Sequence, residues 1–127
     1  MTVKGHCPCG AVQFELDGPF NWVGHCHCDS CRRATGAPLV TFVGHPDGLW
    51  RWTGQEPALY ASSPGTRRTF CPTCGASVTY ATDSTPGETH FHAALLDDPA
   101  SVQPTEIDHA DERLPWMPAD YPGCGKL

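Results

Sequence analysis

Short stretches that alternate apolar and polar residues recur along the chain, and turn residues separate them. The stretch AVQFEL at 11–16 has the period of two that is typical of a half-buried strand. Further strands are predicted at 20–26, 38–44, 49–54, 58–63, 66–71, 76–82 and from residue 88. The turns HPDG at 45–48 and SPGT at 63–66 separate neighbouring strands. The pattern therefore predicts a mainly β fold of short antiparallel strands.

A single segment, DSCRRATG at 29–36, has the signals of a helix. Asp29 or Ser30 is the expected N-cap, and Gly36 is the expected stop. This helix would have barely two turns, so we expect at most one or two very short helices. The proline-rich segment RLPWMPADYPG at 113–123 is predicted to pack over the surface without regular structure.

Composition narrows the class of protein further. A length of 127 residues suits one domain, 1–127, and the 13 glycines and 13 prolines favour many turns. The net charge of −6 removes the usual driving force for binding nucleic acid. Because the sequence has no long apolar run and no signal peptide at its start, we expect no membrane partner and a cytoplasmic location.

The eight cysteines are the strongest chemical signal in the sequence. Seven of them form three clusters: CPCG with Cys7 and Cys9, CHCDSC with Cys26, Cys28 and Cys31, and CPTCG with Cys71 and Cys74. In a reducing compartment, clustered cysteines bind metal or carry out chemistry more often than they form disulfides. A small disulfide-stapled domain is the alternative, but two cysteines one residue apart have poor disulfide geometry.

The two outer clusters have the form of zinc knuckles. Both end in a Cys-Gly pair, and glycine allows the positive φ that turns amide N–H groups toward the sulfurs. Together, Cys7, Cys9, Cys71 and Cys74 would supply the four thiolates of a closed, structural Zn²⁺ site.

The inner cluster, Cys26, Cys28 and Cys31, leaves several alternatives open. The three thiols could be inert, bind metal weakly, or hold a zinc ion with one open position, as catalytic sites do. Alternatively, His25, His27 or Cys124 could complete a second closed site. A histidine beside a cysteine on a strand points to the opposite face, so we expect His25 and His27 to be surface or supporting residues. Spacing alone does not choose between an open and a closed site.

The pattern GHCPCGAVQF, CHCDSCRRATGAP, RRTFCPTCGASVTY and LLDDP resembles the glutathione-dependent formaldehyde-activating enzyme family, which includes centromere protein V. The resemblance covers residues 3 to 123. It implies a compact zinc-stabilised β fold similar to that of a Rab-binding chaperone. It also implies two zinc ions: one structural ion on Cys7, Cys9, Cys71 and Cys74, and a second, open one on Cys26, Cys28 and Cys31. The implied activity is that of a carbon–sulfur lyase acting on the adduct of glutathione and formaldehyde.

The residues suggest how a thiol would be held. Zinc lowers the pKa of a coordinated thiol, and the resulting thiolate attacks an aldehyde carbon. Arg32 and Arg33, with His27, are the predicted substrate-binding residues because they adjoin the inner cysteines. Arg67 and Arg68 are a second candidate pair, of which at most one should face a given site. The sequence does not choose a proton donor among its histidines, which include His90 and His92.

Two further functions stay possible at this stage: a zinc-containing module that binds a protein partner, and a metal or thiol buffer. A pocket leading to the inner cysteines would favour the enzyme. Core packing is the expected role of most of the tryptophans, Trp22, Trp50, Trp52 and Trp116, and of Phe42 and Phe70, although tryptophans could also wall a pocket.

Overall fold

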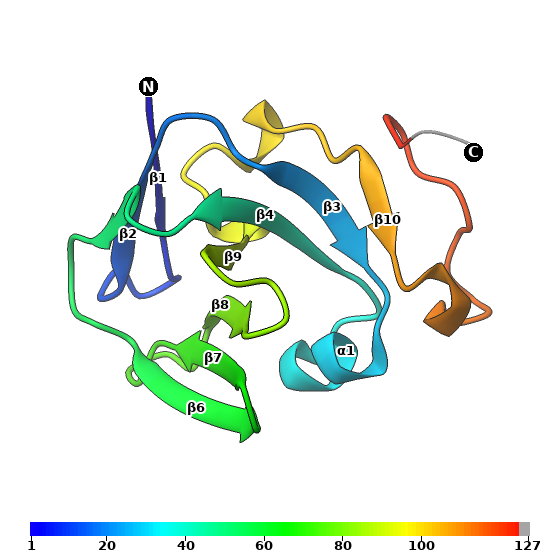
Figure 1. The fold of residues 1–127 in the computed structure, drawn as a ribbon, viewed down its shortest axis with the longest axis horizontal. Helices are drawn as coiled ribbons and strands as arrows, with labels where there is room; N and C mark the ends of the chain where they lie inside the picture. Colours follow the sequence, from blue (N-terminus) through cyan, green and yellow to red (C-terminus); the bar gives the residue numbers. More distant parts are fainter. Residues whose placement is uncertain (125–127) are drawn as a thin grey trace.

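Residues 1–124 are described by a computed structural model, which is mainly β and contains two sheets (Figure 1). The strands are β1 (Thr2–His6), β2 (Gln13–Asp17), β3 (Trp22–Cys26), β4 (Val40–Pro46), β5 (Trp50–Trp52), β6 (Ala58–Ser63), β7 (Thr66–Phe70), β8 (Ser77–Thr82), β9 (Glu88–His92) and β10 (Glu106–Asp108). The helices are α1 (Asp29–Thr35) and the 3-10 turns η1 (Ala93–Leu95), η2 (Pro99–Ser101) and η3 (Ala110–Glu112). The predicted fold class is confirmed. The single domain over 1–127 stays a prediction, and residues 125–127 lie outside the described ones.

The smaller sheet has the strand order β1-β2-β5, and all its pairs are antiparallel. In β2, Phe14 and Leu16 are buried, as the alternation in the sequence predicts. Strand β1 was not predicted. Its residue Gly5 lies opposite Phe14, whose ring occupies the space that a Cβ atom at Gly5 would need. The N-terminal strand therefore depends on a partner that local sequence does not show.

The larger sheet has the order β10-β3-β4-β9-β8-β7-β6. The predicted meander β6-β7-β8 is present, and the neighbouring pairs are antiparallel except that β10 runs parallel to β3. At three residues, β10 is too short to show an alternating pattern, and the sequence did not predict it. The turn at 45–48 forms, but β4 and β5 belong to different sheets, because β5 pairs with β2.

The main core contains apolar residues from both sheets and the two outer cysteine loops. The rings of Phe14 and Phe91 lie 4.8 Å apart, and Trp50 packs 5.3 Å from Phe91. Trp52 also contacts this group, so these two tryptophans have the predicted core role. Phe42 belongs to a second buried cluster with Cys26 and Cys31. This second cluster places two of the inner cysteines against an apolar wall.

Two aromatic residues depart from the predicted core. Phe70 is only half-buried at the end of β7, and Trp116 is 70% exposed. The segment at 113–123 does pack on the protein without forming a helix or strand, since the Tyr121 ring lies 4.8 Å from the ring of His25 on β3. Among the described residues, no helix has the length and apolar character needed to cross a membrane.

Candidate active site

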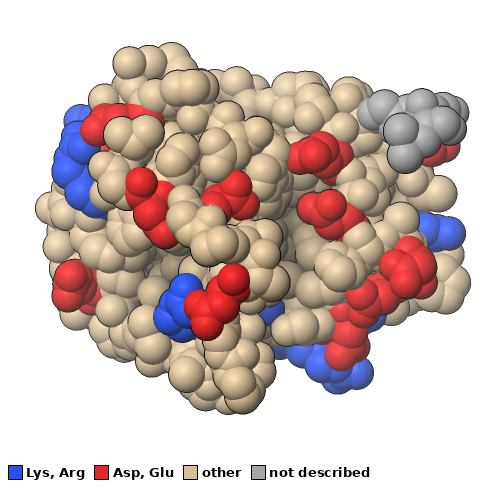
Figure 2. Space-filling model, in the orientation of Figure 1, with Lys and Arg blue, Asp and Glu red and all other residues tan. Residues whose placement is uncertain are grey.

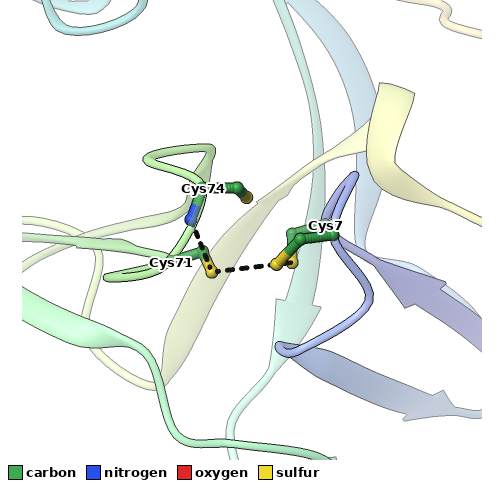
Figure 3. A group of neighbouring side chains, drawn as sticks. Cys7, Cys71 and Cys74 are labelled. Carbon is green, nitrogen blue, oxygen red and sulfur yellow. Dashed lines mark hydrogen bonds between the residues drawn. The ribbon is translucent and has the colours of Figure 1, made fainter.

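Four cysteines come together from two loops. Cys7 and Cys9 follow β1, and Cys71 and Cys74 follow β7. Their Sγ atoms all lie within 4.8 Å of one another. Figure 3 shows how the loop after β7 brings Cys71 and Cys74 beside Cys7. The loops that the sequence predicted to share a site are therefore adjacent, although 62 residues separate Cys9 from Cys71.

The geometry of this group suits a tetrahedral metal. Four sulfurs at a Zn–S distance of about 2.3 Å lie about 3.8 Å from one another. The Sγ atoms of Cys7 and Cys9 are 3.5 Å apart, and those of Cys9 and Cys71 are 3.7 Å apart. The backbone N–H of Val12 donates to Cys7 Sγ, and that of Cys74 donates to Cys71 Sγ, each over 3.4 Å. These donors stabilise thiolates, so the group can hold a metal ion.

The inner cysteines form a second group around the start of α1. Cys26 ends β3, and Cys31 lies in the first turn of the helix. Cys28 is the N-cap, and its Sγ accepts a hydrogen bond from the N–H of Cys31 over 3.2 Å. The predicted N-cap, Asp29 or Ser30, is wrong because the sulfur of Cys28 takes that role. The predicted stop is confirmed, since Gly36 has φ 71° and its N–H donates to the carbonyl of Arg32.

Three sulfurs, without a fourth ligand, make up the inner group. The Sγ atoms of Cys26, Cys28 and Cys31 lie within 4.8 Å of one another, and no other His, Cys, Asp or Glu of residues 1–124 joins them. Cys124 instead contacts the carbonyl oxygens of Pro104 and Glu106, at 3.7 and 3.8 Å. The group can hold a metal ion, and the arrangement favours the open alternative over the closed one.

A cavity of about 360 Å³ leads to these three sulfurs. The rings of Trp22, Phe42 and Tyr80 form one part of its lining. Another part comes from β10 and the residue after it, with the side chains of Glu106, Asp108 and His109. The indole of Trp22 lies close over Gly44 of β4, where an added Cβ atom would meet it at 2.3 Å. A glycine on β4 thus makes room for one wall of the cavity.

A carboxylate–histidine pair on β9 also lines this cavity. Nε2 of His90 lies 2.7 Å from Oε1 of Glu88. Glu88 is held in place by two further donors, the Trp22 indole N–H at 2.9 Å and the Asn21 side-chain amide at 2.8 Å. Burial alone would raise the pKa of Glu88, but these hydrogen bonds together lower it, so the carboxylate is ionised. The sequence placed His90 on a strand but did not show that Glu88 orients it.

Arg68, on β7, is the guanidinium nearest to the inner cysteines. It is largely buried, and its Nη2 lies 3.6 Å from Cys31 Sγ and 3.0 Å from Ser30 Oγ. Its guanidinium also stacks 4.7 Å from the ring centre of Tyr80. A hydrogen bond from Cys26 and the contact with Arg68 lower the pKa of Cys31 to about 5, despite burial. Cys26 and Arg68 therefore favour the thiolate form of Cys31.

Arg67 points to the opposite side of β7 and pairs with Asp83 over 3.0 Å. The prediction that at most one of Arg67 and Arg68 faces a given site agrees with this alternation. The two arginines therefore have different environments although they are adjacent in the chain: one contacts a cysteine of the inner group and the other an exposed carboxylate.

The predicted substrate-binding residues lie away from the cavity lining. Arg32 Nε donates to the carbonyl of His27 over 2.9 Å, and Arg33 pairs with Asp29 on an exposed surface. His27 is fully buried rather than on the surface, and its ring faces Tyr121 at 5.8 Å. None of the three lines the cavity, so their role in binding substrate stays a prediction.

We expect His92 to make the free energy of unfolding depend on pH. Burial against Phe42, and then the charge of Arg68, lower the pKa of His92 to about 4 from its ordinary 6.5. The unfolded chain takes up this proton near pH 6.5 and the folded protein only near pH 4. The contribution of neutral His92 to the free energy of unfolding is therefore fully present above pH 6.5 and is lost as the pH falls toward 4. Between about pH 7 and about pH 5 the loss is about 2 kcal/mol.

Urea unfolding of the native protein and of His92→Gln at both pH values measures this effect. Acid release of any bound metal occurs in both proteins and cancels in the comparison. His109→Asn, at an exposed histidine, serves as the control. If the free energy of unfolding of His92→Gln falls between about pH 7 and about pH 5 by as much as that of the native protein, His92 is not the cause of the pH dependence.

The fold and the two cysteine groups define a small mainly β protein with one closed and one open candidate metal site. A family model described as "Glutathione-dependent formaldehyde-activating enzyme" matches residues 2–111, and the chain belongs to this family. The resemblance seen in the sequence is thereby confirmed.

Two individual proteins are similar to this chain. A protein of Halomonas elongata, provisionally named a glutathione-dependent formaldehyde-activating enzyme, is 26% identical, and the match covers 92% of this chain and 80% of the relative. A crystal structure of a Rhodobacter sphaeroides protein superposes on this chain with a TM-score of 0.66 at 26% identity. The superposition covers 82% of this chain and 98% of the Rhodobacter sphaeroides chain.

Proposed function

We propose that this protein is a zinc-dependent carbon–sulfur lyase that makes and breaks the adduct between a small thiol and a small aldehyde. The family's description names glutathione and formaldehyde as such a pair. One observation carries the proposal: the three inner cysteines open into a cavity, and no fourth ligand closes the group among the described residues. Neither a metal buffer nor a partner-binding module needs such a cavity.

Two zinc ions per chain are part of this proposal. The outer group, Cys7, Cys9, Cys71 and Cys74, would hold a structural ion, because four thiolates complete its tetrahedron. Cys26, Cys28 and Cys31 would hold a second ion. When bound there, zinc supplies a Lewis acid that lowers the pKa of a substrate thiol.

We assign proton transfer to His90, because it lines the cavity and Glu88 orients its ring. Its Nε2 hydrogen-bonds Glu88, so the neutral ring presents an unprotonated Nδ1, which has no hydrogen-bond partner among residues 1–124. In breakdown of the adduct, Nδ1 takes the hydroxyl proton, the C–S bond breaks with its electron pair going to sulfur, and the aldehyde carbonyl forms. In the reverse direction the thiolate attacks the carbonyl carbon and Nδ1 returns the proton to oxygen.

The remaining residues of the cavity position the adduct and limit its access to water. Trp22, Phe42 and Tyr80 offer an apolar surface beside the sulfurs. Arg68 contacts Cys31 and offsets part of the negative charge of three thiolates. A cytoplasmic location is part of the same proposal, because all eight cysteines are free thiols in this structure and a reducing compartment maintains them.

The test is the rate of thiol–aldehyde exchange, measured by NMR magnetisation transfer between the free aldehyde and its adduct. Formaldehyde would be paired in separate samples with glutathione, with 2-mercaptoethanol and with the cationic thiol 2-(dimethylamino)ethanethiol, whose tertiary amine cannot cyclise with the aldehyde. We expect zinc-loaded protein to accelerate exchange above the uncatalysed background with at least one thiol, and Cys28→Ser to remove the acceleration. Exchange at the background rate with all three thiols would contradict the proposed function.

A further inference from the structure

We propose that the thiol substrate is a small aminothiol, whose ammonium group interacts with carboxylates of the cavity, and not a thiol of net negative charge such as glutathione. This inference rests on the proposed function, since it concerns the thiol that enters the same cavity. The charges around the inner cysteines carry it.

Three carboxylates line the cavity with the three sulfurs. They belong to Glu88, Glu106 and Asp108. Glu88 is engaged by Asn21, Trp22 and His90. The carboxylates of Glu106 and Asp108 have neither a hydrogen bond nor an ion pair with another described residue, and both side chains are exposed. They are therefore available to a cation that enters the cavity.

The surface around β10 shows the same excess of negative charge. Figure 2 shows acidic residues gathered over β10 and the segment that follows it, beside a groove in this face. Asp111 and Glu112 lie two and three residues after the cavity residue His109. A ligand approaching the inner cysteines from this side meets carboxylates first.

No described Lys or Arg side chain pairs with the carboxylates of the cavity, and Arg68 contacts the Cys31 sulfur instead. Seven of the eight Lys and Arg residues lie within the described part of the chain, and none of the seven lines the cavity. Their partners are Glu15 for Lys4, Glu15 and Asp17 for Arg51, Asp29 for Arg32 and Arg33, Asp83 for Arg67, Ser30 and Cys31 for Arg68, and the carbonyls of Leu114 and Met117 for Arg113. The eighth, Lys126, lies outside the described residues.

Glutathione would bring two carboxylates and one ammonium group to this site. Three cysteine thiolates with one divalent zinc carry a net charge of about −1. Arg68, 3.6 Å from Cys31 Sγ, offsets this charge in part, and the substrate thiolate adds another negative charge. The carboxylates of the cavity repel a further anion and attract an ammonium group, and the effect is strongest where protein walls limit screening by water. The charge of the cavity thus favours a thiol whose other group is positive.

Three thiols with the same two-methylene spacer test the charge preference directly: cysteamine, 2-mercaptoethanol and 3-mercaptopropionate. Each would be titrated calorimetrically, without aldehyde, into zinc-loaded protein at low salt. We expect the affinity to fall in the order cationic, neutral, anionic, and Cys28→Ser to abolish the binding of all three. Because these thiols also differ in acidity, the informative quantity is the cysteamine-to-mercaptopropionate affinity ratio compared between protein variants.

The double variant Glu106→Gln, Asp108→Asn removes the two unpaired carboxylates. We expect it to lower that ratio roughly threefold to tenfold, the effect of one or two partly exposed charge interactions. Glu56→Gln is the matched control, since it removes an exposed carboxylate that does not line the cavity, and it should leave the ratio unchanged. High salt should shrink the difference between the double variant and the native protein.

The outcomes distinguish failure of the aminothiol inference from failure of the proposed lyase function. Cys28-dependent binding with an unchanged ratio in the double variant overturns the aminothiol inference and leaves the proposed function standing. If the native protein binds 3-mercaptopropionate more tightly than cysteamine, the aminothiol inference is also overturned and the proposed function stands. Absence of Cys28-dependent binding for all three thiols overturns both.

Discussion

Cys74→Ser should lower the thermal midpoint of zinc-loaded protein by about 15 °C or more, corresponding to roughly 4 kcal/mol of lost stability. Cys74 is exposed, so its side chain contributes little by packing. Its effect should come instead from the group with Cys7, Cys9 and Cys71, which ties the loop after β1 to the loop after β7. Removing one of four thiolates opens this link, and Cys7 and Cys71 are fully buried in the main core.

Cys28→Ser should behave differently, with a midpoint within about 5 °C of the native protein and no catalysed exchange. The sulfur of Cys28 caps α1 by accepting from the N–H of Cys31. Serine is among the best N-cap residues, so its hydroxyl preserves this role. It is a much poorer zinc ligand than a thiolate, so the second metal should be lost while the helix stays in place.

Differential scanning calorimetry and the zinc content of each purified variant would distinguish these effects. Native protein treated with chelator provides the reference state without metal. If the two variants melt at the same temperature, the division into a structural and a functional metal group is wrong.

His90→Gln should reduce catalysed exchange by about 10² to 10³-fold, the usual contribution of a positioned general acid–base. Glutamine can still hydrogen-bond Glu88 and fill much of the same space, but it cannot take up a proton. Thiol binding without aldehyde should be retained, because His90 does not belong to the inner cysteine group. Glu88→Gln should show a smaller loss and an altered pH profile, since it removes the charge that orients the ring.

The matched control for His90 is His109→Asn. His109 also lines the cavity, and its backbone φ of 55° suits asparagine, which tolerates the left-handed region. Exchange rates and calorimetric thiol affinities would be measured for all three variants. A rate for His90→Gln equal to that of His109→Asn would show that His90 is not the proton-transferring residue.

The pairing of the outer cysteines illustrates what local sequence predicts well. Each knuckle fixes its own geometry through a tight turn, with Gly10 at φ 80° and Gly75 at φ 81°. A half-site with two thiolates needs a second half-site, and the chain contains one other pair that ends in Cys-Gly. The expected group of four could therefore be assembled without knowledge of the sheets.

The residues around the inner cysteines illustrate what local sequence does not predict. Arg32 and Arg33 adjoin Cys31 in the chain, yet the turn of α1 directs them to His27 and Asp29. Arg68, 37 residues further along the chain than Cys31, reaches the sulfur because β7 passes beside the helix. Proximity in sequence was a poor guide here because a helix distributes adjacent side chains around its axis.

The sequence by itself determined the mainly β class, the positions of most strands, the helix at 29–36 and the family, because alternation, turn residues and cysteine spacing are local features. Tertiary structure decided the small sheet built on β1, the parallel pairing of β10 with β3, and the cavity with Glu88 and His90. Each of these depends on segments that are distant in the chain and meet only when the sheets are complete. The charge of that cavity, to which β10 contributes two carboxylates, follows from this pairing and not from any local motif.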